Sequence, residues 1–119
     1  MENQGCKRRY FFKGKEYGCS FSLAIELIGG KWKAKMIYHL KDGALRSSDL
    51  QRSLCNISNK MFTQTARELE HDGIIQRKVY PVVPPKVEYK LTELGISVMP
   101  VILQLEVWGD QICDKPKAK

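Results

Sequence analysis

In the middle of this 119-residue chain, four side chains that can donate hydrogen bonds follow the i, i+3, i+4, i+7 pattern of one helix face: Lys60, Thr63, Gln64 and Arg67. Steps of three, four and seven residues place side chains on one face of a helix, and these four include no acidic residue. Lysine and arginine bind phosphates, whereas amide and guanidinium groups bind the edges of bases in the major groove. The face therefore carries the chemistry that a DNA-recognition helix requires.

The segment 47–73 around this face is predicted to form two helices joined by a tight turn. We expect Ser47 to cap the first helix and Ser58 to cap the second, because a serine oxygen accepts a hydrogen bond from an N-terminal amide. The second helix turns three apolar side chains inward: Phe62, Ala66 and Leu69. A helical hairpin with an ordinary solvated polar face has the same pattern, so this segment alone leaves two interpretations open.

A basic hairpin is predicted to follow. Residues 74–80 and 86–91 are rich in β-forming side chains, and the proline-rich run 81–85 between them favours a stiff loop. Two helices and then a hairpin indicate a winged helix-turn-helix, which is a mainly α fold with a small β-wing. Several cations are expected to hold the DNA backbone: Arg46, Arg77, Lys78, Lys86 and Lys90.

Two further helices with apolar stripes are predicted before this motif, and Trp32 in the second is expected to be a core residue. Residues 20–28 present Phe21, Ile25 and Ile28, and residues 31–41 present Trp32, Met36, Ile37 and Leu40. Before them, residues 1–18 form a basic and aromatic arm that contacts either DNA or a partner subunit; the sequence favours neither. We place the winged helix-turn-helix domain at residues 19–114 and a basic tail at residues 115–119.

The last helical region is predicted to begin with Thr92 as its cap and to kink or divide at Pro100. Apolar residues recur along it at steps of four and three: Leu94, Val98, Val101, Ile102, Leu105, Trp108 and Ile112. This stripe either folds back on the chain's own core or forms a homodimer. We expect the dimer, because a two-fold dimer also reaches two DNA half-sites.

Composition limits the partners and the chemistry. Twenty Lys and Arg against 13 Asp and Glu give a net charge of +7, which favours nucleic acid or an anionic membrane surface as the partner. We expect a cytoplasmic chain without a membrane span, because no apolar run approaches the roughly 20 residues that a span needs. The cysteines at positions 6, 19, 55 and 113 are scattered, so we expect no metal site. We also expect no cofactor and no enzymatic activity.

Several motifs in this order resemble one known family, the HxlR-type, MarR-like transcriptional regulators. They are Gly29-Gly30-Lys31-Trp32, Asn56-Ile57-Ser58-Asn59-Lys60-Met61, Arg67-Glu68-Leu69-Glu70-His71-Asp72-Gly73, Pro84-Pro85-Lys86-Val87-Glu88-Tyr89, Leu91-Thr92-Glu93-Leu94-Gly95 and Trp108. The resemblance covers about residues 19–108. Three positions depart from the family: Ser20 replaces a proline, Ser47 an aromatic residue and Ala66 a leucine.

The resemblance implies a winged helix, a homodimer formed by the N- and C-terminal helices, and a palindromic operator. It also implies that Cys19 stands where several members carry a thiol that senses oxidants, quinones or other electrophiles. Depressed pKa values favour such reactivity, and we expect Lys15, Lys31 and a helix N-terminus near Ser20 to lower the pKa of Cys19. An inert, partly buried thiol is the alternative, and Cys55 is expected to be a packing residue.

We therefore predict a sequence-specific DNA-binding regulator, a repressor, that binds its operator as a homodimer. The residues predicted to contact DNA are Arg46, Ser58, Asn59, Lys60, Thr63, Gln64, Arg67, Arg77, Lys78 and Lys86. Gln64 is the first candidate for reading an adenine edge. The alternative is a winged-helix module that binds a protein or a small molecule without specific DNA binding, since a fold by itself does not fix a function.

Overall fold

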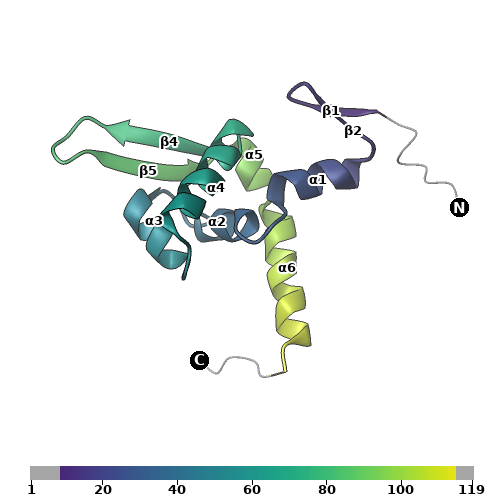
Figure 1. Ribbon diagram of the computed structural model, residues 1–119. Helices are drawn as coiled ribbons and strands as arrows, with labels where there is room; N and C mark the ends of the chain where they lie inside the picture. Colours follow the sequence, from purple (N-terminus) through teal and green to yellow (C-terminus); the bar gives the residue numbers. More distant parts are fainter. Residues whose placement is uncertain (1–8, 115–119) are drawn as a thin grey trace, which may run out of the picture.

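A computed structural model describes residues 9–114 (Figure 1). The elements in chain order are β1 (Tyr10–Phe12), β2 (Lys15–Tyr17), α1 (Ser20–Ile28), α2 (Lys33–His39), β3 (Leu45–Arg46), α3 (Ser47–Ser53), α4 (Asn59–His71), β4 (Ile75–Tyr80), β5 (Lys86–Leu91), α5 (Glu93–Ser97) and α6 (Met99–Ile112).

The core lies where α2, α3 and α4 meet the inner face of a small sheet. Its buried apolar residues are Met36, Ile37, Leu40, Leu50, Leu54, Phe62, Ala66, Leu69, Ile74, Ile75, Tyr89 and Ile102. The three inward residues predicted for α4 all belong to this set, and the polar Thr65 is buried beside them. The predicted helix-turn-helix is therefore confirmed as α3, a turn at residues 54–58, and α4.

The wing is the hairpin of β4 and β5. It belongs to a three-stranded antiparallel sheet whose strand order is β3-β5-β4. The long hairpin of β4 and β5 agrees with the prediction, whereas β3 was not predicted. Only Leu45 and Arg46 form it, opposite Tyr89 and Glu88 of β5. Because the strand continues directly into α3, the N-cap is Arg46 and makes no side-chain capping bond. The prediction that Ser47 caps this helix is therefore wrong by one residue.

The N-terminal segment is more regular than the predicted arm. Residues 10–17 form the β1–β2 hairpin, with Lys13 and Gly14 at positive φ in its turn, and this hairpin contacts α1. The Lys13 side chain reaches Gly73 at the end of α4. Residues 1–8 and the tail 115–119 lie outside the described part of the chain. The second helix also begins later than predicted, at Lys33.

The C-terminal region divides as predicted, because Val98 is both the C-cap of α5 and the N-cap of α6, with Pro100 in the first turn of α6. Thr92 caps α5: its hydroxyl accepts a hydrogen bond from the amide of Gly95 at 3.1 Å. From there α6 extends away from the rest of the molecule (Figure 1). Within residues 9–114 each helix is too short or too polar to span a bilayer.

Candidate nucleic-acid interface

The outer face of α4 is exposed and polar. Lys60, Thr63, Gln64 and Arg67 lie along it and line a surface hollow of about 540 Å³, together with Asn59 and Glu68. The N-cap of the helix is Ser58, whose hydroxyl accepts a hydrogen bond from the Met61 amide at 3.0 Å. Ser58 therefore has a capping role in addition to the DNA contact predicted for it. The side-chain oxygen of Asn59 accepts a hydrogen bond from Nε2 of Gln51 in α3.

One acidic residue in this hollow was not anticipated. Glu68 accepts a hydrogen bond from Nε2 of Gln64 at 3.2 Å and pairs with Lys33 of α2 at 3.5 Å. The spacing of four between Gln64 and Glu68 could have indicated the first contact, because side chains four apart meet on a helix. The contact with Lys33 joins two helices and has no local signal in the sequence.

A second hollow, of about 280 Å³, lies between the start of α3 and the wing. Arg46 and Lys86 both line it, together with Ser47, Ser48, Gln51, Pro85 and Val87. Antiparallel pairing of β3 with β5 brings these two distant cations to one place. Cations and hydroxyl groups on one concave surface are typical of a phosphate-backbone contact.

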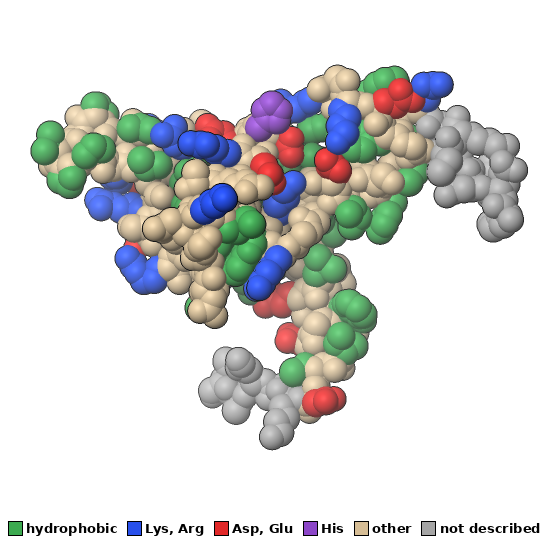
Figure 2. Space-filling view, viewed as in Figure 1, with side chains coloured by type: hydrophobic (Ala, Val, Ile, Leu, Met, Phe, Trp, Pro, Cys, Tyr) green, Lys and Arg blue, Asp and Glu red, His purple; other side chains and the backbone are tan. Residues whose placement is uncertain are grey.

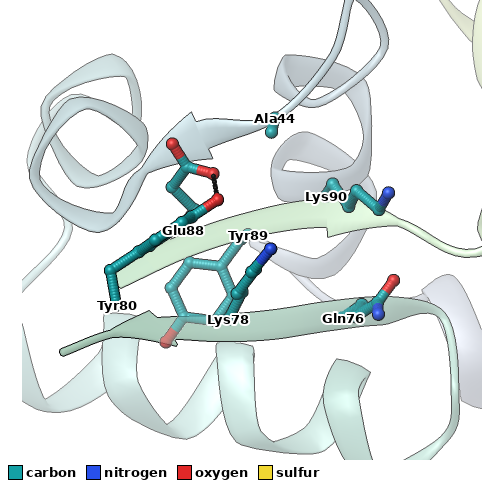
Figure 3. A pocket seen from close by; sticks show the side chains of 7 residues that line it. All are labelled: Ala44, Gln76, Lys78, Tyr80, Glu88, Tyr89 and Lys90. Atoms are coloured by element: carbon teal, nitrogen blue, oxygen red, sulfur yellow. Dashed lines mark hydrogen bonds between the residues drawn. The ribbon is translucent and has the colours of Figure 1, made fainter. Parts of the chain in front are cut away.

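The outer face of the wing holds two lysines around the ring of Tyr80; one of them, Lys78, is drawn in Figure 3. The ammonium groups of Lys78 and Lys86 lie 4.8 and 4.6 Å from the ring centre of Tyr80, within the range of a cation–π interaction. Glu88 accepts a hydrogen bond from the Tyr80 hydroxyl at 3.0 Å and pairs with Lys86 at 3.3 Å. These two contacts lower the pKa of Glu88. Lys86 is thus partly neutralised within the chain.

The cations of the wing do not form a single patch. Arg77 lies opposite Tyr89 in the β4–β5 register, on the face that packs against Phe62 of α4. Lys78 lies opposite Glu88 on the other face, because successive strand residues alternate. One surface of the wing therefore holds Arg77, and the other holds Lys78, Lys86 and Lys90. Figure 2 shows basic side chains gathered over the wing and the α3–α4 region.

Cys19 lies at the N-cap of α1, half-buried. Its Sγ accepts a hydrogen bond from the amide of Ser22 at 3.4 Å and lies 3.2 Å from the Ser22 hydroxyl. The Ser22 hydroxyl and then the Ser22 amide lower the pKa of the Cys19 thiol. The two lysines expected to do this are engaged elsewhere: Lys15 with Glu26 at 3.0 Å, and Lys31 over the Trp32 ring. Cys55 is exposed, so its expected packing role is wrong.

An apolar surface crosses α1, α5 and α6. Its centre is a groove of about 290 Å³ lined by Ser20, Leu23, Ala24, Leu27, Ile28, Ile74, Leu94, Ser97, Val98 and Val101. Phe21 and Ile25 of α1 are exposed beside it. Along α6 the exposed residues of the predicted stripe are Val101, Leu105, Trp108 and Ile112. In Figure 2, apolar side chains are visible on α1 and along one side of α6.

One residue of the predicted dimer stripe belongs to the core instead. Ile102 is only 3% exposed within this chain, so its predicted contact with a partner is wrong. Glu106 lies one turn later on the same side of α6 and accepts a hydrogen bond from the Tyr38 hydroxyl of α2 at 2.7 Å. This side of α6 therefore faces α2. Among the described residues, no group of three or more His, Cys, Asp or Glu is arranged to hold a metal ion.

The chain is similar to known regulators along most of its length. YkvN of Bacillus subtilis, described as an HTH-type transcriptional regulator, is 46% identical over 105 residues, which cover 88% of this chain and 89% of YkvN. An HTH-type regulator of Methanothermobacter thermautotrophicus is 52% identical over 94 residues, covering 79% of this chain and 72% of that protein.

Solved structures show the same similarity in three dimensions. The redox regulator HypR in its oxidized form has a TM-score of 0.77 at 44% identity and covers 82% of this chain and 100% of its own. The reduced form of the regulator YodB from B. subtilis has a TM-score of 0.68 at 35% identity, covering 80% of this chain and 93% of its own. The sequence model of the HxlR-like helix-turn-helix family matches residues 27–117 of this chain. The chain therefore belongs to the HxlR-like helix-turn-helix family of transcriptional regulators.

Proposed function

We propose that this regulator is a homodimer that recognises a palindromic operator and represses transcription in the cytoplasm. The observation that carries the proposal is the exposed polar face of α4, whose Lys60, Gln64 and Arg67 have no role in the core. The apolar surface of α1, α5 and α6 supports the dimer, because large exposed apolar patches mark interaction sites. Two subunits would place their α4 helices in successive major grooves about 10 base pairs apart.

Within each half-site the side chains divide into two roles. Gln64 reads a base edge, and Lys60 and Arg67 bind either guanine or phosphate. Arg46, Lys78 and Lys86 contact the backbone and set the position of the subunit, together with Arg77 from the inner face of the wing. Glu88 already neutralises part of Lys86, so we assign Lys86 a weaker contact than Arg46.

Fluorescence anisotropy tests the proposal with a labelled duplex taken from the DNA upstream of the chain's own gene and a shuffled duplex of equal length. Binding that is at least about tenfold tighter to the upstream duplex, and that weakens with salt, supports an operator. A library of random duplexes extends the search to operators elsewhere. Failure to enrich any sequence from that library would count against specific recognition.

A Lys60→Ala substitution is expected to weaken binding on every sequence and to reduce its salt dependence. Each phosphate contact contributes about 0.9 to the slope of log affinity against log salt, so a dimer that loses two contacts loses about 1.8. The measurement is anisotropy at several salt concentrations. The matched control is Lys41→Ala, because the Lys41 ammonium lies over the ring of Tyr38 on α2 and Lys41 lines neither hollow of the candidate interface. Equal slopes for the two variants would remove Lys60 from the phosphate contacts.

We further propose that Cys19 makes the regulator sensitive to oxidants or quinones. Its N-cap position and its hydrogen bonds with Ser22 favour the thiolate, which is the reactive form. HypR, at 44% identity, is itself a redox regulator. Because α1 borders the apolar groove, modification of Cys19 would change how two subunits pack and hence the spacing of their recognition helices.

Alkylation of Cys19 by iodoacetamide is expected to reach its half-maximal rate at a lower pH in the folded chain than in the urea-unfolded chain. The hydrogen bonds from Ser22 lower the pKa of the thiol, so the thiolate persists to lower pH only while α1 is folded. Mass spectrometry of the Cys19 peptide follows the rate. A Ser22→Ala variant should move the folded midpoint upwards. Identical midpoints in the folded and unfolded chains would contradict this account of the thiol.

A further inference from the structure

A chain of polar contacts links α1 and α2 to the recognition face of α4. The Lys33 ammonium of α2 donates a hydrogen bond to the carbonyl oxygen of Glu26 in α1 at 3.0 Å. The same ammonium lies 3.5 Å from Oε1 of Glu68 on α4. The other carboxylate oxygen of Glu68, Oε2, accepts a hydrogen bond from Nε2 of Gln64 at 3.2 Å. Glu68 therefore bridges Lys33 and the residue proposed to read a base.

Lys33 is well suited to hold this arrangement in place. Its side chain is only 18% exposed, which is low for a lysine. The carbonyl oxygen of Glu26 belongs to the last turn of α1, where helical carbonyls lack a partner in the helix. Lys33 thus satisfies α1 and neutralises Glu68 with one ammonium group. An exposed glutamine–glutamate pair on one helix is weak by itself, and the anchor on a second helix distinguishes this pair.

The chemistry of the carboxylate fixes which way the Gln64 amide points. An ionised carboxylate only accepts hydrogen bonds, so Gln64 must turn its NH₂ group towards Glu68. The opposite orientation would bring two acceptors together. With the NH₂ group held on that side, its second hydrogen and the amide oxygen remain for a ligand. Adenine requires this combination, because its N7 accepts and its N6 donates in the major groove.

We propose that Glu68, anchored by Lys33, is a positioning residue that sets the Gln64 amide for base recognition before DNA binds. The inference rests on the proposed function, since it needs Gln64 to contact a base. Glu68 then raises the specificity of binding and lowers its affinity. Its negative charge beside the DNA repels phosphates, while its hydrogen bond sharpens the choice of base at one position.

The test is a binding selection from duplexes with a random centre, read by sequencing for the wild-type chain and each variant. Gln64→Ala identifies the base pair that Gln64 reads. Glu68→Ala is expected to lower discrimination at that same base pair by about threefold to tenfold, the scale of coupling between hydrogen-bonded neighbours. Its binding to random duplex should stay the same or tighten. Lys33→Met, which keeps the buried stem and removes the ammonium, should lower discrimination at the same base pair.

Two controls separate positioning from a structural or purely electrostatic effect. Glu70→Ala removes the same charge from the other flank of the α4 face and should leave discrimination unchanged. In a Gln64→Ala background, Glu68→Ala should change discrimination no further, because it acts through Gln64. Melting temperatures of all variants exclude unfolding as the cause.

The outcomes separate this inference from the proposed function. If the wild-type chain enriches no sequence, specific recognition fails and the inference fails with it. If the wild-type chain enriches a sequence and Glu68→Ala retains full discrimination at the Gln64 base pair, the positioning role is overturned while the function stands. Equal losses in Glu68→Ala and Glu70→Ala would also overturn it, because they would reflect charge alone.

Discussion

A Leu105→Asp variant is expected to be monomeric at concentrations where the wild-type chain is a dimer, and to bind operator about 10²–10⁴-fold more weakly. Leu105 is 48% exposed on α6, within the apolar stripe that includes Val101 and Trp108. An aspartate there is solvated in a single chain and buried in the proposed dimer, where an unpaired charge is costly. Loss of the dimer removes the gain from binding two half-sites together, which is the source of the large factor.

Sedimentation velocity and anisotropy measure the two effects on the same samples. Leu103→Asp is the matched control, because Leu103 is 37% exposed and lies two residues away, on another side of α6. It should remain dimeric and bind normally. A Leu105→Asp chain that stays dimeric, or that binds operator as the wild type does, would show that the stripe is not the interface. A wild-type chain that sediments as a monomer at all concentrations would remove the proposed dimer itself.

A Gly95→Val variant is expected to lower the free energy of unfolding by about 1–3 kcal/mol or more, the usual cost of overfilling a packed site. Gly95 is buried at the start of α5, where it faces the carbonyl oxygen of Ile74. A side chain at this position would overlap that oxygen and crowd the side chain of Leu91. The backbone must shift, which also disturbs Thr92, whose hydroxyl bonds the carbonyl oxygens of Gly73 and Ile74.

Urea unfolding measures this loss, and a pair of alanine variants isolates its cause. Gly95→Ala and Gly109→Ala both replace a helical glycine and gain helix propensity of about 1 kcal/mol. Apart from its chain neighbours and the backbone of its own helix, Gly109 has no atom within 4 Å of the position that its new methyl group would take, so Gly109→Ala should be neutral or stabilised. Gly95→Ala should be less stable than Gly109→Ala. Equal stabilities would show that the close approach at Gly95 has no energetic consequence.

Local patterns in the sequence predicted much of the fold, because caps and periodicity act over one or two turns. Ser58 and Thr92 cap α4 and α5 as predicted, and the inward and outward faces of α4 follow from steps of three and four. The long hairpin was also readable, since its strands alternate and its loop is rich in proline. The β1–β2 hairpin was missed because its strands of three residues carry too little pattern.

Other features depend on pairing between distant segments. The two-residue strand β3 exists because Leu45 and Arg46 meet β5, and this contact moves the cap of α3 from Ser47 to Arg46. The same pairing brings Arg46 and Lys86 to one hollow. The register of β4 against β5 then separates Arg77 from Lys78. A prediction from local pattern contains none of these pairings.

The sequence by itself determined that α4 carries a donor-rich face, that a basic wing follows it and that α6 carries an apolar stripe. Only the tertiary structure decided how those surfaces are used within the chain. The orientation of α6 against α2 places Ile102 in the core and leaves Leu105 and Trp108 exposed. The approach of α2 to α4 brings Lys33 to Glu68. Periodicity fixes which residues share a helix face, whereas the packing of helices far apart in the chain fixes what each face meets.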